Sequence, residues 1–201
     1  MRKASSSAPT GKGETLQGRG LLRRFARDRQ GAGAVEFAII APLLIVAYVG
    51  AFEVSVGFSM ASKVSRAAST VSDLLTQEPA TTADTVDTMK EVTKRVIAPF
   101  RQVDGYTLKI AGIAVDGDGK ATIAWSRDQA KNEPYPKGSA VTLPSNIQGA
   151  KSLFFVRTEL SVPYTILLMS PNLSSRLNSF PIAKTSYFGL RKGKTIACSG
   201  C

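Results

Sequence analysis

Two carboxylates, Glu36 and Glu53, border a long apolar run and are the ionisable residues whose positions most need a chemical reason. Residues 37–52 contain no charged side chain, and the nine residues after Glu53 are again uncharged. A carboxylate among packed apolar helices is strongly penalised unless it meets a cation. Glu36 therefore needs either a place at a membrane surface or a cationic partner.

Catalytic and metal-binding patterns are weak by comparison. The chain contains no histidine, which removes Ser/His/Asp and Cys/His nucleophile pairs and histidine-containing metal sites. Residues 116–119 (DGDG) resemble the start of a calcium loop, but Lys120 and Arg127 stand where an EF-hand needs oxygen ligands. A hairpin turn is the better interpretation of this segment. Carboxylate or lysine chemistry stays open, but no constellation points to it, so we expect no enzyme, no metal and no cofactor.

Cys198 and Cys201 form a Cys-x-x-Cys motif at the C-terminal end of the sequence. A redox motif of the thioredoxin type would lie near a βαβ pattern and open a helix, and this motif does neither. In an oxidising compartment a disulfide is plausible, either within this short loop or between two chains. We therefore expect a structural role for both cysteines.

The apolar run has the length of a membrane-spanning helix. At a rise of about 1.5 Å per residue, roughly 20 such residues cross the hydrocarbon core, which puts Glu36 and Glu53 near opposite faces of the bilayer. Basic residues before the run hold that flank in the cytoplasm. The arginines in this window are Arg23, Arg24, Arg27 and Arg29. We predict a single pass, at about residues 35–60, with the N-terminus inside.

The basic arm that precedes this helix explains most of the net charge. Residues 1–31 carry eight Lys or Arg and two acids, so six of the eleven net positive charges lie there. An arm rich in Ser, Gly and basic residues cannot bury enough apolar surface to fold by itself. The remaining basic residues are scattered, with no basic patch interleaved with aromatics. We therefore expect no nucleic-acid partner.

Helical periodicity continues beyond the apolar run. A stripe that faces a core is predicted from Val64, Ala67, Ala68, Val71, Leu74 and Leu75. The other faces are predicted to carry Lys63, Arg66, Ser69, Ser72 and Asp73. Pro79 ends the pattern, which predicts one helix over residues 32–78. Thr81 and Asp84 form a capping-box-like start to a second, shorter helix, which Pro99 ends.

From Gly105 the period changes to two, which indicates strands. Alternation predicts roughly four antiparallel strands with one polar face. On one of these strands Ile123 and Trp125 are two residues apart, which predicts that both lie on the same face of the sheet. Gly112 indicates a bulge or a close approach, and Pro163 an edge or a bend. The fold class is therefore α+β, with the core between the apolar face of the sheet and the stripe at residues 64–75.

Two simpler interpretations of the apolar run remain open. It could belong to a secretory signal peptide cut among the small residues near Ala61, although the run is long for that and continues into an amphipathic helix. It could also be a simple membrane anchor, with Glu36 reaching the interface. Neither interpretation explains Gly31.

Residues 30–37 (QGAGAVEF), with Pro42 inside the apolar run and Phe52-Glu53 at its end, resemble the TadE-like minor pilins, or pseudopilins, of tight-adherence (Flp-type) type IV pilus systems. The resemblance is specific over about residues 23–75 and architectural beyond them. Phe37 follows Glu36, as in the TadE-like group, whereas the major Flp pilins usually carry tyrosine there. This difference favours a minor subunit.

The resemblance implies that a membrane prepilin peptidase cuts between Gly31 and Ala32, so that Glu36 becomes the fifth residue of the mature chain. Because glycine lacks a Cβ, a protease can approach the backbone closely. The cut exposes an α-ammonium on Ala32, and the resemblance implies that Glu36, followed by Phe37, pairs with such a group on a neighbouring subunit. That pairing would select the register of packed helices.

The predicted organisation is a basic cytoplasmic leader (1–31), a long helix (32–78) and an extracytoplasmic α+β domain (79–201). We predict an inner-membrane subunit with its C-terminal domain in the periplasm, acting at the assembly platform or within an extracellular adhesive pilus. Its expected partners are the prepilin peptidase, other pilin subunits, the platform and the membrane. The alternative is a bitopic, membrane-anchored binding protein that is not processed at Gly31.

Overall fold

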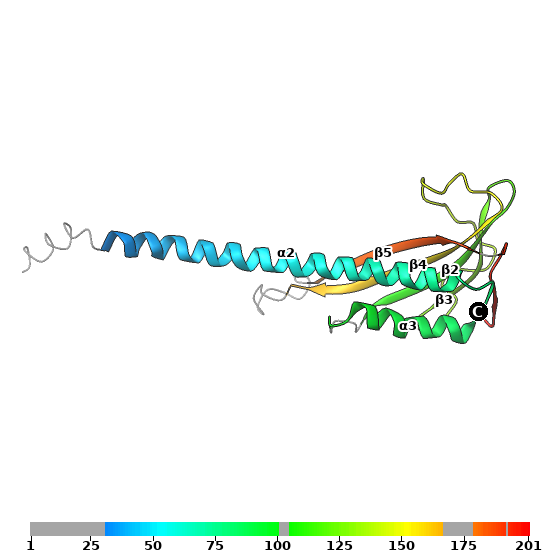
Figure 1. Ribbon diagram of the computed structural model, residues 1–201, viewed down its shortest axis with the longest axis horizontal. Coiled ribbons are helices and arrows are strands. Elements are labelled where there is room, and N and C mark those ends of the chain that lie inside the picture. The colour runs from blue at the N-terminus through cyan, green and yellow to red at the C-terminus, as the bar shows by residue number, and fades with distance from the viewer. Residues whose placement is uncertain (1–30, 101–104, 167–178, 192) are drawn as a thin grey trace, which may run out of the picture. The chain divides into compact units, whose positions relative to one another are not determined.

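A computed structural model describes residues 31–100, 105–166, 179–191 and 193–201 of the chain. The arm at residues 1–30, on which the predicted orientation rests, lies outside the described residues. The elements, in chain order, are α2 (Ala32–Thr76), β1 (Ala80–Thr82), α3 (Ala83–Ile97), β2 (Thr107–Val115), β3 (Ala121–Asp128), β4 (Leu153–Thr165), β5 (Ser179–Gly189) and β6 (Ala197–Ser199) (Figure 1).

The α+β prediction is confirmed. Strands β2 to β5 form an antiparallel sheet in the order β3-β2-β4-β5, and a long and a short helix precede it in the chain. Pro163 lies two residues beyond Ser161, the last β4 residue paired with β2, so it stands where β4 has β5 alone as its neighbour. An edge position therefore accommodates the missing N–H of this proline.

The second half of α2 packs on one face of the sheet, as its apolar stripe predicts. Five of the six stripe residues are buried, and they share a cluster with β2 and β4 residues such as Leu108 and Val156. Leu74 was wrongly predicted to be buried, since 39% of it is exposed. Ser72, predicted on another face, is fully buried, and its hydroxyl donates to Thr158 Oγ1 at 2.8 Å. A polar pair thus takes a place within the helix–sheet contact.

The N-cap residue of helix α3 lies one position after the predicted one. Thr82, not Thr81, is the N-cap: its Oγ1 accepts from the backbone N–H of Thr85 at 3.2 Å. Thr81 instead lies in β1, a strand that sequence periodicity did not indicate and that pairs in parallel with β6. The bidentate ion pair between Arg127 of β3 and Asp87 of α3, at 2.6 and 3.0 Å, ties this helix to the sheet.

Gly112 marks both a bulge and a close approach. The β2–β3 register shifts after Gly112, which leaves Ala124 as the extra residue. A Cβ on Gly112 would lie 2.5 Å from the Trp125 ring and 2.7 Å from Phe154. The bulge also corrects one prediction, because Ile123 and Trp125 pack in different clusters, on opposite faces of the sheet. The tryptophan thereby joins the helix-facing core.

The second face of the sheet is not the polar face that was predicted. It carries its own buried cluster of Ala111, Ile113, Val115, Ala121, Ile123, Leu143 and Phe155. The segment after β3 covers it: Tyr135 Oη donates to Glu159 Oε2 at 2.7 Å, and the Arg157 guanidinium lies 4.4 Å from the Tyr135 ring centroid. Burial, reinforced by the bond to Glu159, raises the pKa of Tyr135 to about 12. The loop between β3 and β4 thus covers this face of the sheet and shields its apolar residues from water.

The C-terminal segment packs beside the helix-facing core. The Trp125 indole N–H donates to the Ile196 carbonyl at 2.9 Å, and both side chains are buried. Cys198 and Cys201 form a disulfide within their own loop, the local form of the two that the sequence left open. The hairpin interpretation of residues 116–119 is also confirmed, since Asp116 Oδ1 accepts from the N–H groups of Asp118 and Lys120.

Candidate functional site

The predicted processing residues lie at the start of α2. Helix α2 begins at Ala32, and Gly31 immediately before it is exposed. A Cβ on Gly31 would meet nothing within 4 Å, and its φ is not in the left-handed region. Neither packing nor backbone conformation therefore requires glycine at this position, in contrast to Gly112.

Glu36 and Phe37 follow within the first turns of the same helix. Both are exposed, Phe37 at 71%. Within the described part of the chain, Glu36 has no ion pair and no hydrogen bond through its side chain. Glu36 follows Ala32 by four residues, which is about one helical turn. The structure thus leaves an exposed carboxylate one turn from the predicted new N-terminus.

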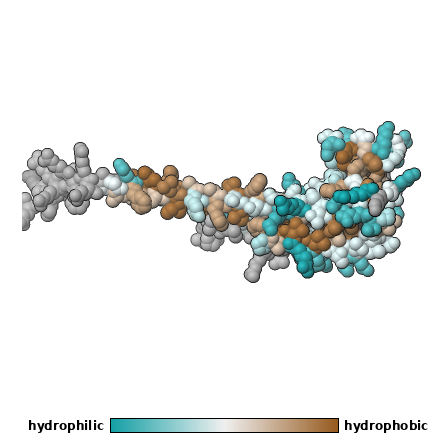
Figure 2. Space-filling view, viewed as in Figure 1, coloured by the Kyte–Doolittle hydropathy of each residue, from teal (hydrophilic) through white to brown (hydrophobic). Residues whose placement is uncertain are grey.

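The helix around these residues presents apolar side chains outward. Those at least 47% exposed between residues 35 and 58 are Val35, Phe37, Ile39, Ile40, Leu43, Leu44, Ile45, Val46, Tyr48, Phe52, Val54 and Phe58 (Figure 2). By length and composition α2 could cross a membrane, with a mean hydropathy of 2.2 in its most apolar window. Large contiguous apolar surfaces on a protein mark a membrane or partner contact.

Glu53, unlike Glu36, has a partner in its own chain. Tyr164 Oη donates to Glu53 Oε2 at 3.2 Å, and the Tyr164 ring packs against Phe180 with centroids 5.4 Å apart. The same ring would lie 3.9 Å from a Cβ on Gly57. Burial, followed by the bond to Glu53, raises the pKa of Tyr164. The end of β4 therefore reaches α2 at Glu53 and Gly57, a contact that the sequence alone did not indicate.

The comparisons with known proteins single out the same helix. Residues 31–73 match the TadE-like protein family. The match confirms the resemblance predicted from the sequence, and it begins at Gly31. We call residues 31–73 the TadE-like segment. No curated protein and no solved structure matches the chain.

The TadE-like segment contains two structurally different parts. Its first part holds Gly31, Glu36 and the exposed apolar run, and its second part, from Met60 on, is built into the core. The match over this segment suggests a protein associated with Tad pili. The structure places all four predicted site residues, from Gly31 to Phe37, in the first part of the segment.

Sequence reasoning missed the polar residues of the second part. Ser72 falls four residues after Ala68, in line with the buried stripe, so helical spacing alone could have shown that it is buried. Its partner Thr158 lies on β4, and a pairing across 86 residues needs the folded chain.

Proposed function

We propose that the protein is a minor pilin, or pseudopilin, of a Tad pilus system, cut by a prepilin peptidase between Gly31 and Ala32. The observation that carries this proposal is the family match that starts at Gly31, where the fold itself has no need of glycine. Since folding does not require glycine next to the first helical residue, recognition by another protein would explain its presence. A peptidase that holds the backbone closely would require a residue without a Cβ.

The first part of α2 serves in this proposal as the membrane anchor. Residues 33–52 would span about 30 Å as a helix, which is the thickness of the hydrocarbon core. Tyr164 contacts α2 from Glu53 on, so the apolar residues before that position are the ones available to lipid. The basic leader at residues 1–31 would stay in the cytoplasm and residues 79–201 would lie in the periplasm.

Glu36 serves as the assembly residue. A bare carboxylate at this depth is costly, and the described part of the chain offers it no cation. The α-ammonium that a cut at Gly31 creates on Ala32 of a neighbouring subunit would neutralise it, with Phe37 adding apolar contact. The pair would favour one axial register between helices, in an adhesive filament or at the inner-membrane assembly platform.

The processing step is tested by mass spectrometry of the N-terminus of protein from membrane and pilus fractions. A mature chain that begins at Ala32 supports the proposal. Gly31→Ala is expected to leave only the uncut precursor, while Gly33→Ala is cut normally. Gly33 is the matched control, because a Cβ there also meets nothing within 4 Å.

Two results would overturn the processing step. An intact N-terminus in the wild-type chain would favour a bitopic anchored binding protein, and a start near Ala61 would favour a signal peptide. Equal processing of Gly31→Ala and Gly33→Ala would show that glycine at position 31 is not read by a peptidase.

The assembly step is tested with a pair of carboxylate variants. Glu36→Gln should still be cut but should lose co-purification with other pilus subunits, because the amide cannot pair with an ammonium charge. Glu53→Gln should retain assembly, since its oxygen can still accept from Tyr164. Wild-type assembly of Glu36→Gln would remove the charge-pairing role.

A further inference from the structure

One end of the sheet is a two-stranded ribbon, made of residues 162–165 of β4 and 179–182 of β5, which we call the β4–β5 ribbon. Strand β4 meets α2 first through Thr158 and Ser72, and then through Tyr164, whose hydroxyl donates to Glu53. The strand therefore runs along α2 toward the helix's N-terminal part (Figure 1). The ribbon lies against the helix where the long apolar run ends.

The surface at this end is apolar and uncharged. Phe180, 47% exposed, packs on Tyr164, and at the same level of α2 the side chains of Val54 and Phe58 are 73% and 75% exposed. Three segments that meet here contain no Lys, Arg, Asp or Glu, namely residues 54–62, 162–166 and 179–183. The nearest carboxylate, Glu53, accepts the hydrogen bond from Tyr164. The apolar surface of the helix thus continues onto the sheet.

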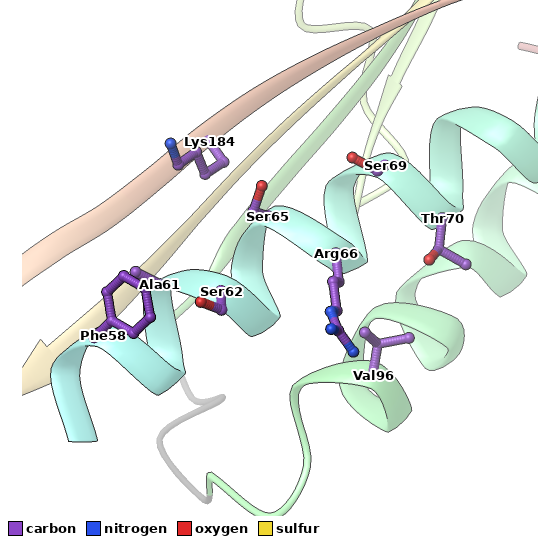
Figure 3. Close-up of a pocket in the computed structure, with 9 residues that line it drawn as sticks. All are labelled: Phe58, Ala61, Ser62, Ser65, Arg66, Ser69, Thr70, Val96 and Lys184. Atoms are coloured by element: carbon purple, nitrogen blue, oxygen red, sulfur yellow. The ribbon is translucent and has the colours of Figure 1, made fainter. Parts of the chain in front are cut away.

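This apolar band has a polar border. Along α2, Phe58 is followed by Ser62 and Arg66 (Figure 3). Along β5, Phe180 is followed four residues later by Lys184, which projects from the same side of the strand because side chains alternate. The band is therefore narrow and lies only next to the apolar run.

The backbone of the ribbon is also adapted to a site with little water. Pro163 and Pro181 are directly opposite each other. The Leu190 N–H donates to the Phe154 carbonyl, so that pair is hydrogen-bonded, and alternation along the unbroken register makes the proline pair a non-hydrogen-bonded one. The N atoms of such a pair point outward, away from the ladder. Neither edge of the ribbon therefore presents an N–H at this level, where a donor without water would be costly.

The ribbon lies at the depth of a membrane interface if α2 spans the bilayer up to residue 52, as proposed above. Residues 53–57 then extend about 2 to 8 Å beyond the hydrocarbon core. The headgroup region on one side of a bilayer is about 5 to 7 Å thick. Tyr164 touches α2 within these residues, and amphipathic aromatic rings concentrate in this layer.

We propose that the β4–β5 ribbon is a second membrane contact, in which Phe180 enters the interfacial layer on the periplasmic side and docks the domain on the bilayer. Tyr164 supports the Phe180 ring, and the two opposed prolines leave no outward N–H to lose its water. The contact depends on apolar surface and not on charge, so it forms on uncharged phosphatidylcholine. The inference rests on the membrane placement proposed above and does not depend on a cut at Gly31.

The test is spin labelling of the full-length protein in phosphatidylcholine vesicles. Cys198 and Cys201 are joined in a disulfide, so a thiol-specific nitroxide attaches to a cysteine introduced elsewhere. Collisions of the label with oxygen, which concentrates among acyl chains, are compared with collisions with a water-soluble nickel chelate. Phe180→Cys should collide more with oxygen. Lys184→Cys is the matched control, about 13 Å further along the same side of β5, and should collide more with nickel.

A label at Leu44→Cys separates the two proposals. Leu44 is 59% exposed and lies inside the proposed span, so its label should favour oxygen strongly. Oxygen preference at position 44 with nickel preference at position 180 would overturn the ribbon contact and leave the anchor intact. Nickel preference at position 44 would overturn the membrane placement itself. Exclusion of both reagents from position 180 would show a protein contact there in place of lipid, which also overturns the proposal.

A second measurement needs no substitution, in case Phe180→Cys does not fold. Wild-type protein in the same vesicles is irradiated with a diazirine that is soluble only in lipid, and the attachment sites are located by peptide mass spectrometry. Attachment is expected on Phe180 and on α2 before Glu53, and not on the hairpin at residues 116–120. Labelled α2 with an unlabelled Phe180 would contradict the ribbon contact.

Discussion

The two parts of α2 differ in whether contacts within the folded chain explain their residues. Between residues 35 and 58 most of the large apolar side chains are exposed, and the described chain does not cover them. From Met60 to Leu75 the same helix is buried against the sheet, with Val64 and Val71 fully inaccessible. Residues of the second part are explained by folding, whereas those of the first part need something outside the fold.

Gly31 and Gly112 show the same contrast at single positions. Gly112 cannot carry a Cβ, because the Trp125 and Phe154 rings already occupy the space. Gly31 has open space around it. An identical residue is thus a packing requirement in one region and a candidate recognition signal in the other. The free energy of unfolding of the domain separates the two cases.

The largest loss of stability is expected for Gly112→Ala. The added methyl would lie 2.5 Å from Trp125, so the core must shift. Overpacking of this kind costs about 3 kcal/mol, at the upper end of its usual range. Urea unfolding followed by far-UV circular dichroism measures the change. A loss below about 0.5 kcal/mol would show that the core adapts freely at the bulge.

Asp87→Asn should cost about 2 kcal/mol, because it leaves the Arg127 charge without its bidentate partner. The hydrogen bond from Arg127 lowers the pKa of Asp87 below its usual 3.8. The stabilisation is therefore fully present above about pH 4 and is lost as pH falls through the lowered pKa. The stability difference between wild type and Asp87→Asn should shrink in that acid range. A difference that stays constant down to pH 2 would contradict this.

Ser72→Ala is expected to cost about 1 to 2 kcal/mol, since it leaves the buried Thr158 hydroxyl without its donor. Ser65→Ala is the matched control at a half-buried position of the same helix, where the hydroxyl makes no hydrogen bond with a described residue, and it should change stability by less than about 0.5 kcal/mol. Adding Thr158→Val to Ser72→Ala should recover part of the loss, because both partners of the pair are then apolar. Equal effects of the two serine changes would refute the contrast between helix faces.

Gly31→Ala and Glu36→Gln should leave the free energy of unfolding unchanged within about 0.3 kcal/mol, while they alter processing and assembly. Both residues are exposed, and a Cβ on Gly31 meets nothing within 4 Å. Urea unfolding in detergent, followed by fluorescence of the single tryptophan, measures this on the full chain. A clear loss of stability in either variant would break the division of α2 into two parts.

Much of the fold followed from local patterns. The long helix, the short helix, the hairpin at residues 116–119 and the α+β class were all predicted, because caps, prolines and periodicity act between near neighbours. The errors were local slips with long-range causes. Thr81 was wrongly predicted as the N-cap, because it belongs to β1, which pairs with β6 far along the chain. Ile123 and Trp125 were wrongly predicted on one face of the sheet, because a bulge lies between them.

The candidate site divides in the same way. Gly31, Glu36 and the apolar run are contiguous, so their chemistry could be judged from spacing and hydropathy alone, and the family match fell on the same segment. The contact between Glu53 and Tyr164 could not, since the two residues lie 111 residues apart in the chain. Spacing along a sequence does not show which distant side chains meet.

The sequence by itself determined the membrane-length helix, the glycine and glutamate at its start, and the succession of helices and strands. Each depends on residues within a few turns or strands of one another. The tertiary structure alone decided that Ser72 is buried against Thr158, that Glu53 meets Tyr164 across 111 residues, and that the Trp125 indole donates to the Ile196 carbonyl. These contacts depend on strand order and on one bulge. Periodicity specifies neither, because the stability of a strand pair depends on side chains from two different segments of the chain.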